Sequence, residues 1–150
     1  MKELKEVLEK GNEFVEPMCY SGDYMEQVYT KEMEDGGIPY SGILYEKYPS
    51  GNIKYYCEYE NGVPNGEFIR FYDDGSVLSI ENMDKGTVSG IHKEYYPNGN
   101  LKLEENCQYG IILNSKKYGE NGEVLDIKAE PTSTEKILLR RFEQKYGKIY

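Results

Sequence analysis

Hydrophobic and polar positions repeat along residues 40–126 with a period of 24 residues. Three sets of glycines keep this step through three successive copies. They are Gly42, Gly66 and Gly90, then Gly51, Gly75 and Gly99, and then Gly62, Gly86 and Gly110. A fourth, degraded copy has Asn114 in the first glycine position and Gly122 in the second, one residue early. Periods of this length are typical of supersecondary units stacked side by side.

Each copy predicts a strand, a tight turn, a second strand and another turn. Residues 53, 55, 57 and 59 are Ile, Tyr, Cys and Tyr, and period-2 alternation places them on one face of a strand. Glycine closes the first turn of each copy, where a short hairpin with a bulge needs a positive φ. No connection is long enough for a crossover helix, so the repeats predict an elongated antiparallel meander of about eight strands.

Aligning the copies predicts which side chains share a face. One column is aliphatic and a second is tyrosine, whereas two others are polar. The aliphatic column contains Ile53, Val77, Leu101 and Val124, and the tyrosine column contains Tyr48, Tyr72 and Tyr96, with Tyr118 near the equivalent point. One polar column contains Glu46, Arg70 and Glu94, and the other contains Glu58, Asn82 and Asn106. We therefore expect one apolar, aromatic face and one charged face. Most tyrosines are expected to be sheet-forming residues whose hydroxyls stay in water.

The segment before the repeats predicts a short helix and one strand. Residues 2–10 form an amphipathic pattern with Leu4, Val7 and Leu8 in its apolar stripe and Gly11 as the C-cap. Such a helix is too short to be stable alone, so we expect it to dock on the sheet. Residues 12–23 are typical of a loop, and residues 24–33 alternate well enough for a leading edge strand.

The segment after the repeats predicts a second helix. Thr132 can act as its N-cap and Glu135 completes a capping box, and the helix should run to about Tyr146, before Gly147. Its apolar face contains Ile137, Leu138, Phe142 and Tyr146. One interpretation is a lid packed on the last strands, and the other is a partner-binding helix. The chain is thus expected to be one mostly β domain, with a helix and leading strand in 1–36, repeats in 37–128 and a helix in 129–150.

Composition restricts the partners that the chain can bind. The net charge is −9, and mean hydropathy is −0.76 with 38% hydrophobic residues, which is low for a compact core but suits a repeat array. An acidic protein is repelled by nucleic-acid phosphates and by anionic lipid. The charge therefore argues against a nucleic-acid binder and against membrane association. It either maintains solubility or attracts a basic partner.

Cysteine usage and the first residues predict a cytoplasmic protein. The three cysteines are an odd number without short spacing, which is typical of a reducing compartment. Cys57 and Cys107 are expected to fill the core. Charged residues interrupt residues 1–20, so they contain no apolar segment of the kind found in signal peptides and membrane spans.

The sequence predicts no catalytic residue, metal site or cofactor. The single histidine, His92, aligns with Leu44 and Phe68, which favours packing over catalysis. No nucleophile elbow, zinc spacing, calcium loop or phosphate loop is present. A carboxylate pair formed only in three dimensions stays open, because Glu81 and Glu105 share a column in adjacent copies.

The repeat pattern resembles a known family. The pattern looks like the MORN repeat. In order, it has a glycine, four residues, an aromatic-Tyr pair, two residues, a second glycine, one residue, an aliphatic residue and a closing Asn/Lys-Gly pair. The pattern is most similar to the bacterial variant of YwqK-like antitoxin proteins. The resemblance covers about residues 37–128 and is closest at 48–54 and 96–102. Similar repeats are found in membrane-associated eukaryotic proteins, so the repeat is more specific for fold than for function.

The favoured hypothesis is a non-enzymatic protein-binding repeat protein. The resemblance implies a cytoplasmic antitoxin or immunity protein whose partner is a cognate toxin. Many toxins that act on nucleic acid have basic clefts, which an acidic, tyrosine-rich sheet face could occupy. The predicted partner-binding residues are Glu46, Glu58, Glu81, Glu94, Glu105, Tyr56, Tyr95 and Tyr96. The alternatives are a structural scaffold, including one at a membrane surface, and a hydrolase-like enzyme built on a carboxylate cluster.

Overall fold

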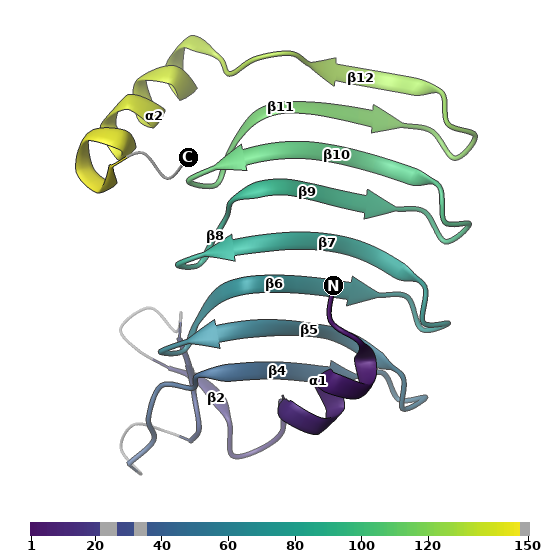
Figure 1. The fold of residues 1–150 in the computed structure, drawn as a ribbon, viewed down its shortest axis with the longest axis vertical. Helices are drawn as coiled ribbons and strands as arrows, with labels where there is room; N and C mark the ends of the chain where they lie inside the picture. Colours follow the sequence, from purple (N-terminus) through teal and green to yellow (C-terminus); the bar gives the residue numbers. More distant parts are fainter. Residues whose placement is uncertain (22–26, 32–35, 148–150) are drawn as a thin grey trace.

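The repeats form one long antiparallel meander within a ten-stranded sheet (Figure 1). The structure is a computed structural model and describes the chain except residues 22–26, 32–35 and 148–150. The strands of the meander are β4 (Gly42–Lys47), β5 (Ile53–Glu60), β6 (Val63–Phe71), β7 (Val77–Asp84), β9 (Gly90–Tyr95), β10 (Leu101–Gln108), β11 (Ile111–Tyr118) and β12 (Val124–Lys128), and the short β8 (Thr87–Val88) pairs with β7. Every neighbouring pair in the meander is antiparallel, as the connections predicted.

Two kinds of turn alternate along the two sides of the sheet. On one side, Gly51, Gly75, Gly99 and Gly122 all have φ between 86° and 94°, and a bulge in the strand pairing adjoins each turn. On the other side, a pair of residues with positive φ connects each repeat to the next, as at Asn61 (φ 50°) and Gly62 (φ 79°). Two successive positive φ values define the hairpin turn whose twist matches that of the strands. The predicted role of these glycines is confirmed.

A ladder of tyrosine hydroxyls connects successive repeats on the side of the bulged turns. Tyr48 Oη donates to the Phe71 carbonyl at 2.7 Å, and Tyr72 Oη donates to the Tyr95 carbonyl at 2.7 Å. Tyr96 Oη donates to the carbonyl of Tyr118 at 2.8 Å. The expectation that tyrosine hydroxyls stay in water is wrong for this column, because each ring spans the gap to the next repeat and satisfies its backbone.

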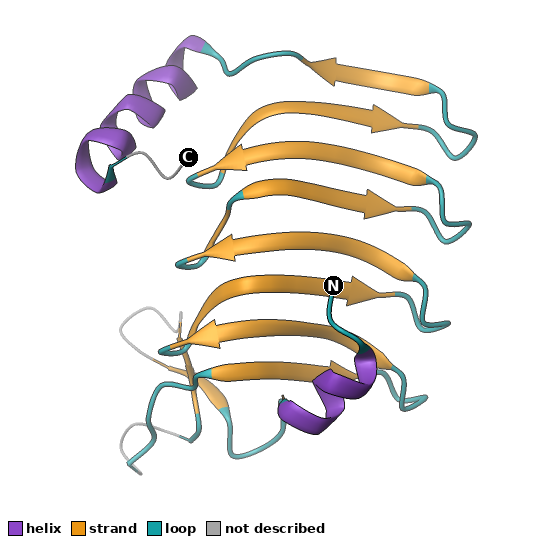
Figure 2. Cartoon of the chain, viewed as in Figure 1, coloured by secondary structure: helices purple, strands orange, loops and turns teal. Residues whose placement is uncertain are grey.

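The segment before the repeats covers the first strands on both faces. Helix α1 (Leu4–Lys10) lies on one face, which we call the α1 face (Figure 2). Strands β2 (Cys19–Ser21) and β3 (Gln27–Tyr29) pair with each other, and β3 packs on the opposite face, which we call the β3 face. The two-residue strand β1 (Asn12–Glu13) pairs in parallel with β4 and forms the edge of the sheet.

Three predictions for this segment need correction. Residues 12–23 were expected to be a loop but contain β1 and β2. The strand expected at 24–33 contains β3, which pairs with β2 in a separate two-stranded sheet, and its remaining residues lie partly outside the described ones. Of the predicted apolar stripe of α1 only Val7 is buried, whereas Leu4 and Leu8 are exposed.

The hydrophobic core lies at the β4–β6 end of the sheet and has one cluster on each face. Val7 of α1 packs with Tyr56 and Ile69 on the α1 face, and Val28 of β3 packs with Leu44 and Cys57 on the β3 face. Of the 13 buried hydrophobic residues among those that the structure describes, only Cys107 comes after Phe71. The expected division into an apolar and a charged face is therefore wrong. Each face is apolar where a flanking segment covers it and more polar beyond.

Helix α2 (Ser133–Tyr146) follows the sheet and lies beside its β10–β12 end (Figure 2). Its start was predicted correctly, since Thr132 is the N-cap and Glu135 completes the capping box. The lid interpretation is wrong, because α2 has no buried residue and Ile137 is 51% exposed. Phe142 instead packs against Tyr109, in the turn between β10 and β11, at 5.3 Å between ring centroids. In the described part of the chain, neither helix has the length and apolar character needed to cross a membrane.

Candidate functional site

Two rows of cross-strand neighbours cross the β3 face from one end of the sheet to the other. In each row the strand register places side chains of successive strands opposite one another. The first row contains Leu44, Cys57, Phe68, Glu81, His92, Glu105, Ser115 and Lys128, and the second contains Glu46, Tyr55, Arg70, Ser79, Glu94, Leu103, Lys117 and Asp126. The first row is apolar under β3 and polar from β7 onward. This uncovered, polar part contains the candidate site.

A cluster of paired charges occupies the middle of the β3 face. Arg70 binds Glu81 at 2.6 Å, and His92 Nδ1 lies 3.0 Å from Glu105 Oε2. His92 Nε2 lies 3.6 Å from Glu81 and 3.5 Å from Glu94, and it forms no hydrogen bond with any residue that the structure describes. Glu81 and Glu105 were expected to be near each other, and they flank His92 from opposite sides. These contacts bring Arg70 and His92 together with three carboxylates, those of Glu81, Glu94 and Glu105.

The chemistry available to this cluster is limited. No group of His, Cys, Asp and Glu side chains within the described residues is arranged to hold a metal ion. Cys57 and Cys107 are buried, as predicted, and neither forms a disulfide. Burial raises the pKa of Cys57 to about 12 and that of Cys107 to about 11, so both thiols stay protonated and unreactive near neutral pH.

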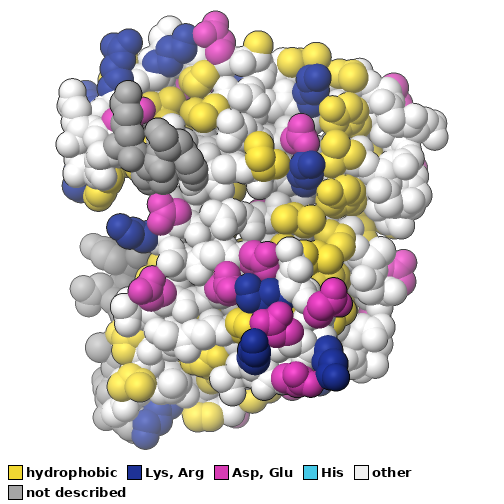
Figure 3. Space-filling view, in the orientation of Figure 1, with side chains coloured by type: hydrophobic (Ala, Val, Ile, Leu, Met, Phe, Trp, Pro, Cys, Tyr) yellow, Lys and Arg dark blue, Asp and Glu magenta, His cyan; other side chains and the backbone are white. Residues whose placement is uncertain are grey.

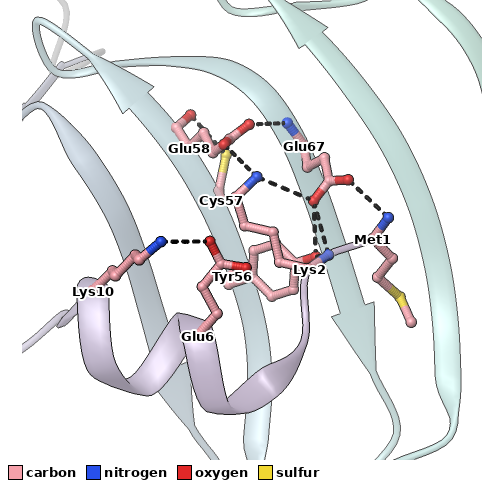
Figure 4. A network of polar contacts seen from close by, with 8 residues as sticks. All are labelled: Met1, Lys2, Glu6, Lys10, Tyr56, Cys57, Glu58 and Glu67. Carbon is pink, nitrogen blue, oxygen red and sulfur yellow. Dashed lines mark hydrogen bonds and ion pairs between the residues drawn. The ribbon is translucent and has the colours of Figure 1, made fainter.

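The α1 face contains three of the predicted partner-binding residues, and α1 occupies two of them (Figure 4). Tyr56 is completely buried, and its hydroxyl donates to Glu67 at 3.0 Å. Glu58 pairs with Lys2 at 2.6 Å. The hydrogen bond from Lys2 to Glu58 is the main cause that raises the pKa of Lys2. Tyr95 lies further along this face, beyond α1 and half-buried.

Figure 3 shows the rest of the α1 face. Hydrophobic side chains form a band along the side of the bulged turns, and charges of both signs mix over the sheet and α1 (Figure 3). Lys93 and Glu104 are opposite one another and pair at 3.2 Å in the uncovered part of this face. The face therefore has no continuous acidic surface.

The other five predicted residues, Glu46, Glu81, Glu94, Glu105 and Tyr96, lie on the β3 face. Sequence reasoning missed that Lys or Arg side chains already pair with four of the five predicted carboxylates, those of Glu46, Glu58, Glu81 and Glu94. Besides the pairs above, Glu46 lies 3.6 Å from Lys54 and Glu94 lies 3.7 Å from Lys102. Any charge attraction to a partner must therefore compete with these internal pairs.

Two hollows on the β3 face have the same construction. The first, of about 580 Å³, is lined by Glu46, Tyr48, Lys54, Tyr55, Arg70, Phe71 and Leu78 together with Tyr20, Tyr59, Pro64 and Phe68. The second, of about 340 Å³, is lined by Glu94, Tyr96, Lys102, Leu103, Lys117, Tyr118 and Leu125. Glu46, Tyr48 and Lys54 of the first hollow correspond to Glu94, Tyr96 and Lys102 of the second, exactly two repeats later in each case.

The shared geometry of the hollows extends to their contacts. Lys54 lies over the ring of Tyr48 at 5.9 Å, and Lys102 lies over the ring of Tyr96 at 5.7 Å. In the repeat between them, Leu78 occupies the lysine position, so alternate repeats carry the full set. Four strand spacings separate Glu46 from Glu94, which places the hollows about 19 Å apart. The 24-residue alignment contains this signal, but only the fold shows that lysine and glutamate meet across the hairpin.

The fold and these surfaces define a class of repeat protein. The sequence model of the protein family described as MORN repeat variant matches residues 40–61, 64–85 and 89–106. The chain is also similar to "Immunity protein YwqK" of Bacillus subtilis (strain 168), with 30% identity over 124 residues, 83% of this chain and 79% of the relative. The chain therefore belongs to the family of MORN-repeat proteins that includes YwqK. No solved structure matches the chain.

Proposed function

We propose that this protein is an immunity protein that neutralises a cognate protein toxin by binding it on the β3 face. The observation that carries the proposal is the similarity, over most of both chains, to a relative whose name is immunity protein. The open repeat sheet supports it, because such a sheet presents a long surface for a protein partner.

The two equivalent hollows are the proposed contact points. Each has a tyrosine ring and apolar side chains as its walls and one Lys–Glu pair at its rim. Aromatic and apolar pockets of this kind receive the anchor side chains that dominate binding energy. Cations of a basic toxin would replace Lys54 and Lys102 next to Glu46 and Glu94, which would steer association by charge.

Among the predicted residues, Glu46, Glu94 and Tyr96 are therefore the proposed direct contacts. Glu81 and Glu105 support the same face through Arg70 and His92. Tyr56 and Glu58 hold α1, and the proposal gives them no contact with the toxin while α1 is in place.

The proposal is tested by capture of partners from the native organism with three immobilised proteins. They are the wild type, Glu94→Lys/Leu125→Asp in the second hollow, and Ile91→Asp as the control. Ile91 is 50% exposed and Leu125 is 62% exposed, but Ile91 lies outside the hollow, on the α1 face. Captured proteins are identified by mass spectrometry and their affinities measured with purified components.

We expect the wild type and Ile91→Asp to retain one stoichiometric, basic protein whose toxicity they suppress. The hollow variant should bind it at least about tenfold more weakly, because a handful of central residues carry most of the affinity of such interfaces. A partner that tolerates the hollow variant but not Ile91→Asp would place binding on the α1 face. The absence of any toxic partner at low and at physiological salt would contradict the proposed function.

A further inference from the structure

The last strand of the sheet has an open edge. Strand β12 pairs with β11, and no strand in the described part of the chain lies beyond it (Figure 1). The opposite edge differs, because β1 covers β4 and the N–H of Phe14 donates to the Tyr45 carbonyl at 2.7 Å. An edge strand turns a row of N–H and C=O groups outward, and these groups can pair with another strand. β12 is therefore available for such pairing.

The side chains of β12 suit a strand that another strand joins. Val124 is 54% exposed, Leu125 is 62% exposed and Ile127 is 55% exposed. Natural proteins protect open edges with prolines, charges that point inward or a covering segment. β12 contains no proline, and helix α2 lies beside the ends of the strands rather than along this edge (Figure 1).

The charges of β12 are self-complementary in one register. If two copies pair antiparallel about Ile127, Asp126 of each copy lies opposite Lys128 of the other, and the symmetry makes this contact twice. Asp126 and Lys128 project from the same face, since they lie opposite Lys117 and Ser115 in the two rows of the β3 face. Opposite charges in facing positions stabilise a strand pair.

Neighbouring registers are less favourable. Pairing about Asp126 would place the two Asp126 carboxylates opposite each other, which is destabilising. In the register about Ile127 the two isoleucines instead meet on the α1 face. Lys128 already binds Glu135 at 2.8 Å, and an ammonium with three donors can keep that contact while it binds Asp126.

We propose that β12 pairs antiparallel with β12 of a second copy of this chain, in the register centred on Ile127, so that two sheets become one. The occupant of the edge is thus the chain itself, and the proposal does not depend on toxin binding. The two-fold arrangement leaves the β3 face of each copy free.

Sedimentation equilibrium of the full chain over a wide concentration range tests the proposal. The variants are Asp126→Lys, Lys128→Glu and the double exchange Asp126→Lys/Lys128→Glu. The control is Glu120→Lys, which makes the same charge change as Asp126→Lys but in the exposed turn before β12. Far-UV circular dichroism confirms that each variant is folded.

The wild type and Glu120→Lys should form dimers with the same dissociation constant. Each single variant at positions 126 and 128 should weaken the dimer at least about tenfold, because two attractive pairs become repulsive. The double exchange should restore the dissociation constant to within about threefold of wild type. A chain that is monomeric at about 1 mM, or a dimer unaffected by either single variant, would overturn the proposal.

Hydrogen exchange of the wild type gives a second reading that needs no variant. Amides of residues 124–128 should become more protected as the concentration rises, whereas amides of the covered strand β5 should not change. Concentration-independent exchange at residues 124–128 would contradict self-pairing. Protection that comes only with a captured toxin would assign the edge to that partner and would equally reject the second copy.

Discussion

The two ends of the sheet are built from the same repeat but are stabilised differently. At the N-terminal end, α1 and β3 cover opposite faces of β4–β6, and 12 of the 13 buried hydrophobic residues in the described ranges lie at or before Phe71. At the C-terminal end, both faces are open, α2 contributes no buried residue and β12 is exposed on three apolar side chains. The repeat therefore specifies the strands and turns and most of the core side chains, while the segments outside it cover those side chains and exclude water from them.

The two ends also differ in their surfaces. The covered end contains most of the core and the first hollow, and the open end carries the second hollow and the free edge. Substitutions of similar chemistry should therefore have unequal effects at the two ends.

The largest difference is expected between two tyrosines of the α1 face. Tyr56→Ala should lower the free energy of unfolding by about 3–5 kcal/mol, because a fully buried aromatic ring leaves a cavity next to Phe71. Tyr95→Ala, in the uncovered half, should cost about 1 kcal/mol or less. Urea denaturation of both variants measures the comparison. Equal losses would show that the C-terminal half has a core of its own.

A smaller loss of stability is expected when a hydroxyl of the tyrosine ladder is removed. This loss should be the same at the two ends of the sheet. Tyr48→Phe and Tyr96→Phe each remove one hydroxyl that donates to a backbone carbonyl in the next repeat. Each should cost about 1 kcal/mol, the usual net value of one hydrogen bond. Urea midpoints at matched concentration provide the test. A loss confined to Tyr48 would mean that the ladder is stabilising only where the sheet is covered.

The smallest expected effect is on how the free energy of unfolding changes at acid pH, and it should differ between the two ends of the sheet. Burial raises the pKa of Glu67, but hydrogen bonds from the N-terminal ammonium and Tyr56, with the charge of Lys2, outweigh it and hold this pKa below its usual value. A carboxylate whose pKa is lower in the folded state than its unfolded value near 4.5 stabilises the fold at pH values above 4.5. This contribution is lost as the pH falls through the folded-state pKa.

Glu67→Gln should therefore reduce stability at pH 7 and leave a smaller further loss between pH 5 and acid pH than wild type shows. The matched variant is Glu135→Gln, whose carboxylate also has a lowered pKa, chiefly through Lys128, but lies on the exposed helix α2. Its effect should be weaker because solvent screens an exposed pair. Urea midpoints across this pH range measure both, and identical pH profiles for the two variants would refute the distinction.

The sequence predicted the repeat-based parts of the fold and little of what covers them. The glycine period located the turns, and the capping box located the start of α2, because these signals depend on local backbone geometry. The pairing of β3 with β2, and the burial of Val7 alone in α1, depend on contacts between distant segments that no period encodes. For the same reason the columns aligned Glu46 with Glu94 but did not reveal Lys54 and Lys102 beside them.

The prediction for His92 shows a different limit. Alignment with Leu44 and Phe68 correctly indicated that the side chain is largely sheltered, since its exposed fraction is 12%. It gave no indication of Glu105 as its neighbour, because that pairing follows from the register between β9 and β10.

The tyrosine ladder also fixes how this protein can change in length. Each hydroxyl reaches a carbonyl about one period ahead, 23 residues on from Tyr48 and from Tyr72. Loss or gain of a whole 24-residue copy would preserve every step. The 22-residue step from Tyr96 to Tyr118, in the copy that is one residue short, shows that a step also tolerates a change of one residue. Because a copy adds two strands, the spacing between surface features can change only in increments of about 10 Å. The ladder thus sets the spacing between surface features. Relatives with more or fewer repeats would present the same contacts at multiples of about 10 Å.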